Sequence, residues 1–178
     1  MWYDSAFRPK QVSLIQGFDM TINVGDKIPI MTLKTMVAGK PKDITSEEVF
    51  SGKRVVLFAV PGAFTPGCSM THLPGYVVNA DKIIAKGVDT IACIAVNDVF
   101  VMGAWGGAHN ADHLLMLADG NGDFTRALGL EVDLTAHALG FRSQRYAMIV
   151  ENGTVRTLSI EPGPGISISA AESIMEAL

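Results

Sequence analysis

The sequence predicts an α/β protein with a mixed central sheet and helices on both faces of that sheet. Three observations support this fold class. The apolar run at 54–60 is bounded by turn residues, which is typical of a strand buried on both faces. A helical pattern and a second apolar run follow it, and the order strand, helix, strand implies a parallel pair with a right-handed crossover. Two later strand-like runs flank Asn152-Gly153, the pair that tight hairpins prefer.

The first half of the chain contains five predicted elements. Residues 28–33 are predicted to form a short strand, and the capping-box pattern at 45–48 opens a short helix. Residues 54–60 and 90–96 are predicted to be strands. Between them lies a helix whose apolar residues recur at spacings of three and four and whose C-terminal cap is Gly87. Those apolar positions are Leu73, Tyr76, Val77, Ala80, Ile83 and Ile84.

The second half continues the alternation of helices and strands. Asn97-Asp98 can cap a helical segment that runs through Trp105. After it we predict a strand at 113–118, a short helix at 124–128, the hairpin strands at 145–150 and 154–160, and a terminal helix opened by a capping box at 169–172. Parallel units followed by a hairpin and a last helix indicate a thioredoxin-like fold.

Length and composition favour one domain. The chain has 178 residues, of which 48% are hydrophobic and 18% are charged, so it can bury a sizeable core. We predict a single domain at 20–178, preceded by a loosely held arm at 1–19. The formal charge of -4 and the scattered Lys and Arg residues argue against nucleic acid as a partner. No apolar run approaches the roughly 20 residues that span a bilayer, so no membrane association is expected.

The chain has two cysteines, which is too few for a disulfide scaffold. Free thiols are typical of a reducing compartment, and residues 1–19 lack the continuous apolar segment of a secretory signal. We therefore expect a cytoplasmic location.

Cys68 follows a strand and lies where a helix is predicted to begin. Thr65 can serve as the N-cap with Pro66 in the first helical position, which places Cys68 in the first turn. The unpaired amide hydrogens of a first turn favour a thiolate over a thiol. The alternative is a small buried hydrophobic residue, the commoner fate of a free cysteine. Capping alone does not decide between the two.

The wider motif does decide. Pro61-x-x-x-Thr65-x-x-Cys68, within PGAFTPGCSMTHLPGY, resembles the active-site signature of the peroxiredoxins, specifically the type II branch, also called the peroxiredoxin-five subfamily. The resemblance extends over about residues 21–178, through separated blocks that agree in order and spacing. These blocks are IACIAVNDVFVMGAW, LLMLADGNGDFTRALGLEVDL, RSQRYAMIVENGTV and SIEPGPG.

The resemblance implies a role for each residue of the motif. Cys68 would be the peroxidatic cysteine, which attacks a hydroperoxide and becomes a sulfenic acid. Thr65 would hydrogen-bond the sulfur and the peroxide, and Pro61 would shield the sulfur from water. Arg145 would hold the thiolate and polarise the peroxide, because negative charge gathers on the leaving oxygen and an arginine never loses its own charge. Without the resemblance, Arg145 is an ordinary arginine at a strand end, and Arg142 in the preceding loop is its competitor.

His72 is four residues after Cys68, so on a continuous helix both side chains share one face. His72 can assist the thiolate or simply pack beside it, and Pro74 can distort the turn. If His72 acts instead as a base, Cys68 could be the nucleophile of a hydrolase, although no third member of a triad is evident. A redox sensor without turnover is the other rival.

Cys93 is the only internal thiol that could resolve a sulfenic acid on Cys68. It lies about three residues before the end of its predicted strand, or roughly 10 Å back into the sheet, beyond the ~7 Å alpha-carbon limit of a disulfide. Some relatives carry a late resolving cysteine, but 163–171 contains none. We therefore expect Cys93 to be mainly a core residue, and an external thiol to regenerate Cys68: glutathione with glutaredoxin, or else thioredoxin.

No cofactor or metal is expected. His109, Asp112 and His113 lack further zinc ligands, the acidic loop at 119–123 lacks the glycine and glutamate of a calcium loop, and no glycine-rich phosphate cradle follows a strand. The sequence thus predicts a thiol-dependent peroxidase for hydrogen peroxide and small alkyl hydroperoxides. Relatives often form dimers near the active-site loops, so the resemblance also implies a homodimer.

Overall fold

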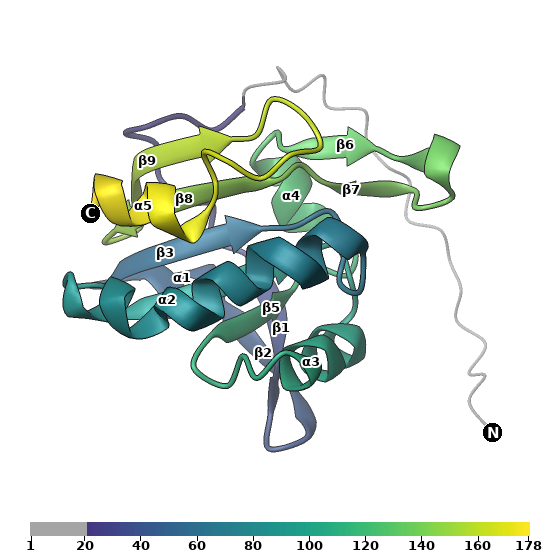
Figure 1. The fold of residues 1–178 in the computed structure, drawn as a ribbon, viewed down its shortest axis with the longest axis horizontal. Coiled ribbons are helices and arrows are strands. Elements are labelled where there is room, and N and C mark those ends of the chain that lie inside the picture. The colour runs from purple at the N-terminus through teal and green to yellow at the C-terminus, as the bar shows by residue number, and fades with distance from the viewer. Residues whose placement is uncertain (1–20) are drawn as a thin grey trace.

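The structure is a computed structural model that describes residues 21–178, and the predicted arm at 1–19 lies outside the described residues. Within 21–178, the main sheet has seven strands in the order β2-β1-β5-β4-β3-β8-β9 (Figure 1). They are β1 (Thr32–Val37), β2 (Lys40–Thr45), β3 (Arg54–Ala59), β4 (Thr90–Ala95), β5 (Leu115–Ala118), β8 (Tyr146–Glu151) and β9 (Thr154–Ile160). A separate pair joins β6 (Glu131–Asp133) to β7 (Phe141–Ser143).

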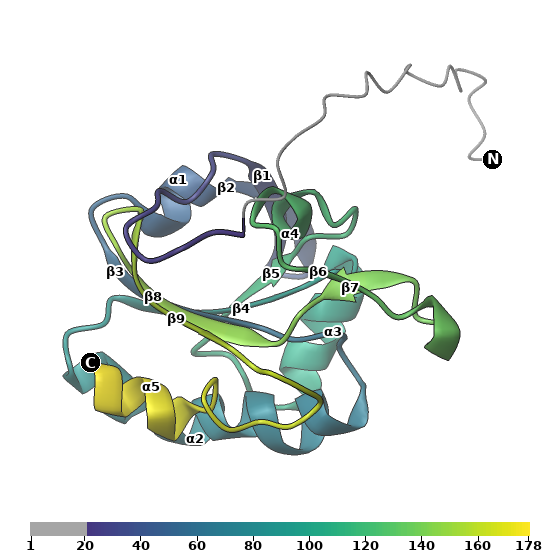
Figure 2. The same cartoon turned by 90° about the horizontal axis from the view of Figure 1, so that it is seen from above.

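The main sheet is mixed, as predicted. Strands β3, β4 and β5 run parallel, whereas β8 pairs antiparallel with β3 and with β9. Figure 2 shows α1 and α4 on one side of the sheet and α2, α3 and α5 on the other. These helices are α1 (Ser46–Phe50), α2 (Leu73–Ala85), α3 (Val99–Ala108), α4 (Asp123–Ala127) and α5 (Ala171–Ala177). The predicted fold class is therefore confirmed.

The central strands supply side chains to two separate cores. Along β3, Val56 and Phe58 point into the core under α2, α3 and α5, while Val55 and Leu57 point into the core under α1 and α4. All four are fully buried. Alternation of apolar residues toward both faces is why this segment reads as one continuous apolar run. Because both faces are covered, β3 is held rigidly, and the loop that follows it starts from a fixed point.

Local signals set several boundaries correctly. Thr45 and Glu48 form both bonds of the capping box at α1, and the Asp98 side chain accepts from the first amides of α3. Asn152 and Gly153 both have positive φ, 46° and 71°, as the turn of the β8–β9 hairpin requires.

Two predictions of elements are wrong. The strand expected at 28–33 begins instead at Thr32, because the preceding segment pairs with the hairpin turn: the Ile28 N–H donates to Gly153 O at 2.9 Å. The expected capping box at 169–172 does not form. Helix α5 begins after Ala170, which has no side-chain cap, and the Ser169 hydroxyl donates instead to Glu161 Oε1 at 2.8 Å.

Within residues 21–178, the structure contains no helix that combines the length and the apolar character needed to cross a membrane.

Candidate active site

Cys68 lies in the turn that connects β3 to α2. The helix begins after Thr65, whose carbonyl accepts from the Ser69 N–H at 3.0 Å. One π-helical turn follows over Cys68–His72, closed by the bond from Leu73 N–H to Cys68 O, and α2 continues from there. Cys68 is thus near the helix start, as predicted. The side-chain cap is wrong, however, because the Thr65 hydroxyl donates to Gly62 O at 2.8 Å.

The Cys68 side chain is fully buried, packed in the same core as Phe58, Leu73 and Tyr76. The sequence alternative of a buried cysteine is therefore right about exposure. Its surroundings are not purely apolar, because Arg145 Nη2 lies 3.5 Å from Cys68 Sγ. A guanidinium at this distance stabilises negative charge on the sulfur.

Arg145 is delivered by the strand pairing of β8 with β3. Tyr146, the first residue of β8, pairs with Ala59, the last residue of β3, so Arg145 stands beside the loop that carries Cys68. Arg145 is only 9% exposed. Its Nη1 donates to His72 Nδ1 at 3.1 Å while its Nη2 faces the sulfur. One rigid guanidinium therefore contacts both acceptors.

His72 is neutral and has both ring nitrogens occupied. Its Nε2 lies 3.0 Å from the Ser169 carbonyl, which only accepts, so Nε2 carries the hydrogen and Nδ1 is free to accept from Arg145. Burial lowers the pKa of His72 to about 4; the bond to Ser169 opposes this shift, and the Arg145 charge adds to it. His72 thus has no free nitrogen to deprotonate Cys68, which argues against the hydrolase alternative.

The competing arginine, Arg142, supports the loop instead. Its Nε donates to Leu139 O at 2.7 Å, and its Nη1 lies 3.4 Å from both Pro61 O and Asn97 Oδ1. Asn97 Oδ1 also accepts from the Ala63 N–H at 2.9 Å. These contacts tie down the segment on which Pro61 sits. The sequence did not predict that Arg142 and Asn97 support this loop together, because the two residues lie far apart in the chain.

Cys93 lies in the middle of β4, opposite Phe58 of β3, and is fully buried. Its side chain enters the same core as Cys68, and both cysteines are free thiols. Burial raises the pKa of the Cys93 thiol, and the neighbouring Cys68 adds to the effect. Cys93 is therefore a poor nucleophile in this structure.

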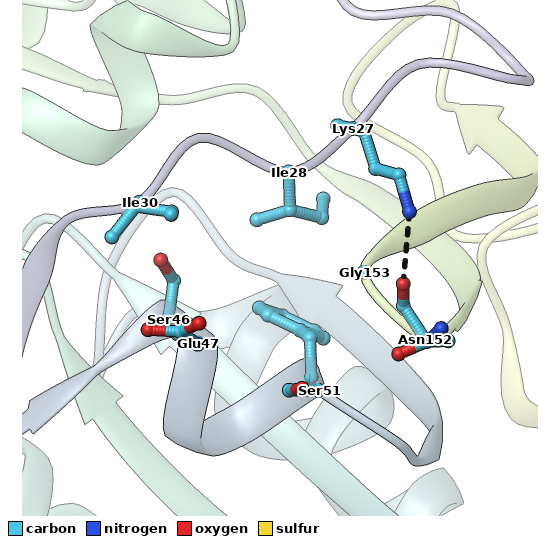
Figure 3. Close-up of a pocket in the computed structure, with 9 residues that line it drawn as sticks. Lys27, Ile28, Ile30, Ser46, Glu47, Ser51, Asn152 and Gly153 are labelled. Atoms are coloured by element: carbon cyan, nitrogen blue, oxygen red, sulfur yellow. Dashed lines mark hydrogen bonds between the residues drawn. The ribbon is translucent and has the colours of Figure 1, made fainter.

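A pocket of about 450 Å³ adjoins the site. It is lined mainly by apolar groups and reaches Arg145, and its lining residues are Pro61, Val132, Leu134, Gln144, Arg145, Glu161, Pro162, Gly163 and Pro164. A different pocket, of about 310 Å³, lies between α1 and the β8–β9 turn, where Lys27 Nζ donates to Asn152 O (Figure 3). That second pocket has no cysteine in its lining and is remote from Cys68 in the fold.

Comparison with known proteins gives a consistent family. The sequence model described as Redoxin matches residues 23–176. The chain is 49% identical to peroxiredoxin-2E-2, chloroplastic, from Oryza sativa subsp. japonica, covering 89% of this chain and 73% of that protein. Reduced Prx3 from Vibrio vulnificus, solved in complex with hydrogen peroxide, is 54% identical with a TM-score of 0.85, covering 88% and 99% of the two chains.

Peroxiredoxin 5 from Alvinella pompejana is also similar, with 41% identity, a TM-score of 0.78, and coverage of 88% of this chain and 97% of that one. The Redoxin model alone spans residues 23–176, a range that includes the loop after β3 and the start of β8. The chain belongs to the peroxiredoxins, in the type II (peroxiredoxin-five) branch, and is a thiol peroxidase.

Proposed function

We propose that Cys68 is the peroxidatic cysteine. The observation that carries this assignment is the 3.5 Å contact between Arg145 Nη2 and Cys68 Sγ. The thiolate attacks the terminal oxygen of a hydroperoxide, the S–O bond forms as the O–O bond breaks, and the sulfur is oxidised to a sulfenic acid. The leaving alkoxide or hydroxide takes up a proton, giving an alcohol or water.

Arg145 stabilises both the thiolate and the charge that develops on the leaving oxygen. Thr65 takes part by turning its hydroxyl from Gly62 O toward the peroxide, a rotation about one side-chain bond. Pro61, which has no N–H to bind water, borders the pocket beside Arg145 and limits hydration of the sulfur. Because Cys68 is fully buried, we propose that a peroxide reaches it through movement of the loop at 61–67 or of the segment at 161–166.

An external thiol regenerates Cys68. Cys93 is buried within β4, and its raised pKa keeps it protonated, so it is poorly placed to attack a sulfenic acid. Glutathione attacks the sulfenic sulfur, releases water and leaves a mixed disulfide, which glutaredoxin then reduces; thioredoxin is the alternative reductant. The substrates we propose are hydrogen peroxide and small alkyl hydroperoxides.

Peroxide consumption by wild type, Cys68→Ser and Cys93→Ser, each with glutathione/glutaredoxin and with thioredoxin, tests these assignments. Cys68→Ser should lose all turnover, and Cys93→Ser should keep it with at least one reductant. Loss of turnover with every reductant in Cys93→Ser would refute the external-thiol proposal. A redox sensor would consume about one peroxide per chain and stop, and a hydrolase would cleave an activated ester with no peroxide present.

The homodimer and the cytoplasmic location stay predictions. Exposed apolar side chains beside the active-site turn support the homodimer: Phe64 is 57% exposed and Met70 is 78% exposed. Pairing of two copies over this surface would remove both side chains from water.

A further inference from the structure

Glu161, which directly follows β9, stands at the start of a chain of hydrogen bonds that ends at Cys68. We propose that Glu161 is a positioning residue for the peroxidase reaction. Acting through Ser169 and His72, it fixes the direction of the Arg145 guanidinium. This inference rests on the proposed function, because it concerns how efficiently Cys68 reacts.

The first link joins the Glu161 carboxylate to the segment before α5. Glu161 is 8% exposed and accepts four hydrogen bonds. Two come from Ser167, through N at 2.6 Å and Oγ at 2.9 Å, and two from Ser169, through N and Oγ, each at 2.8 Å. Burial by itself opposes ionisation, but these bonds outweigh it and lower the pKa of Glu161 to about 2. At neutral pH the carboxylate can only accept, so all four groups must donate to it.

The second link fixes the hydrogen on His72. Since the Ser169 hydroxyl gives its proton to Glu161, its oxygen presents a lone pair to His72 Nε2 at 3.3 Å. The Ser169 carbonyl lies 3.0 Å from the same nitrogen and also accepts from Tyr76 Oη at 2.8 Å. Two acceptors facing Nε2 require the hydrogen there.

The third link aims the guanidinium. With its hydrogen on Nε2, the His72 ring offers a lone pair at Nδ1, which accepts from Arg145 Nη1 at 3.1 Å. The guanidinium is planar and rigid, so holding Nη1 also fixes Nη2, which faces the sulfur. If the hydrogen moved to Nδ1, two donors would face each other and the guanidinium would have to turn away. The backbone gives a second tie, because the Glu161 N–H donates to Arg145 O at 2.9 Å.

Two substitutions separate the hydrogen-bond chain from the charge. Glu161→Ala removes every acceptor, whereas Glu161→Gln keeps an acceptor oxygen for Ser169, and the Ser167 hydroxyl can turn to accept from the new amide. Glu172→Ala is the matched control. It removes a carboxylate of α5 that accepts from Asn79 Nδ2 at 3.1 Å and makes no hydrogen bond to Glu161, Ser169, His72 or Arg145. The second-order rate constant for oxidation of the Cys68 thiol is measured by stopped flow with hydrogen peroxide and with tert-butyl hydroperoxide.

Glu161→Ala should lower this rate constant about tenfold or more, since small misplacements of a catalytic group have effects of this size. The factor should be the same for both peroxides, because Glu161 acts on the protein and not on the substrate. Glu161→Gln should restore the rate to within about twofold, and Glu172→Ala should leave it unchanged. In a His72→Asn background, Glu161→Ala should cause no further loss, because the link to Arg145 is already broken.

A histidine-ring nitrogen-15 spectrum supplies a readout that a purely structural role would not move. In wild type His72 should show the hydrogen on Nε2. In Glu161→Ala the Nε2 resonance should move, because Ser169 N–H and Oγ lose the carboxylate that holds them and the Ser169 carbonyl that accepts from Nε2 is no longer fixed. If Glu161→Ala does not fold, Ser169→Ala tests the same link, since it removes the hydroxyl and keeps the backbone.

Three results would overturn the inference: an unchanged rate constant in Glu161→Ala, a factor that differs between the two peroxides, or a loss that persists in the His72→Asn background. Failure of the proposed function looks different, because wild type itself would then form no sulfenic acid on Cys68.

Discussion

At the scale of single residues, Arg145 directs one guanidinium nitrogen at Cys68 and the other at His72. A lysine keeps the positive charge but has one nitrogen, so it cannot face both acceptors with fixed geometry. Arg145→Lys should therefore lower the rate constant for oxidation of Cys68 about 100-fold or more, the usual effect of losing an aligned donor. Stopped-flow oxidation by hydrogen peroxide measures this, with Arg156→Lys as the control because Arg156 pairs with Glu151 on the exposed side of β9. Equal loss in both variants would contradict the role of Arg145.

The buried His72 makes the free energy of unfolding depend on pH. Its folded-state pKa of about 4 lies below its ordinary value of 6.5, so the unfolded chain binds a proton first on acidification. The contribution of His72 to the free energy of unfolding is therefore complete above pH 6.5. It is lost as the pH falls toward 4, by at most about 3 kcal/mol. Urea unfolding at pH 7, 6 and 5 should show this loss in wild type and a smaller one in His72→Asn. An equal change in the free energy of unfolding with pH in the two proteins would contradict a neutral buried His72.

The Glu161 carboxylate contributes in a lower window. Its pKa of about 2 lies below the ordinary 4.5, so its contribution to stability is complete above pH 4.5 and is lost as the pH falls toward 2. Glu161→Gln should therefore weaken the acid dependence of unfolding between pH 4.5 and 3 and leave it unchanged above pH 5. Loss of the acid dependence above pH 5 in this variant would contradict the assignment.

At the scale of elements, α3 supports the active-site turn from the side. The Asp98 carboxylate accepts from Phe100 N and Val101 N, each at 2.9 Å, and the Trp105 ring donates to Ser69 Oγ at 2.9 Å, next to Cys68. Asp98→Ala should lower the free energy of unfolding by about 1 kcal/mol, as loss of an N-cap generally does. Asp98→Asn, which can still cap, is the control in urea unfolding. Equal stability of Asp98→Ala and wild type would contradict the capping role.

The elements that could be predicted from sequence are those whose side chains carry the whole signal. Strand β3 is a continuous apolar run that is buried on both faces. Helix α2 repeats its apolar residues every three or four positions and buries one face. Strand β2 was missed because KPKDIT is polar and forms the edge of the sheet. Strands β6 and β7 were missed because three residues are too short to show a period.

The site divides in the same way. The motif around Cys68 is local, and resemblance located it together with Arg145, which lies 77 residues later. The resemblance did not define what His72 does. The role of His72 is set by its contact with Ser169, and these two residues are 97 positions apart in the chain. Ser169 itself was misassigned as a helix cap. A serine followed by a glutamate at the right spacing fits a capping box, and only the fold shows that Glu161 binds the hydroxyl instead.

At the scale of the whole molecule, the predicted homodimer can be tested by measuring the mass of the protein in solution. The chain has a mass of 19.0 kDa, so sedimentation of the reduced protein should give a species of twice that mass. Phe64→Asp places a charge in the exposed apolar surface beside the active-site turn and should shift the protein toward the single-chain mass. A wild-type protein that sediments at 19.0 kDa over all concentrations tested would contradict the dimer.

Under the proposed function, the buried sulfur of Cys68, held by Arg145, is the atom that peroxide oxidises. Reduced protein is treated with one equivalent of hydrogen peroxide in the presence of dimedone, and the adduct is located by mass spectrometry. We expect an adduct on Cys68, none on Cys93, and slower formation of the adduct in Arg145→Lys. An adduct on Cys93, or formation of the Cys68 adduct at an unchanged rate in Arg145→Lys, would contradict the proposed function.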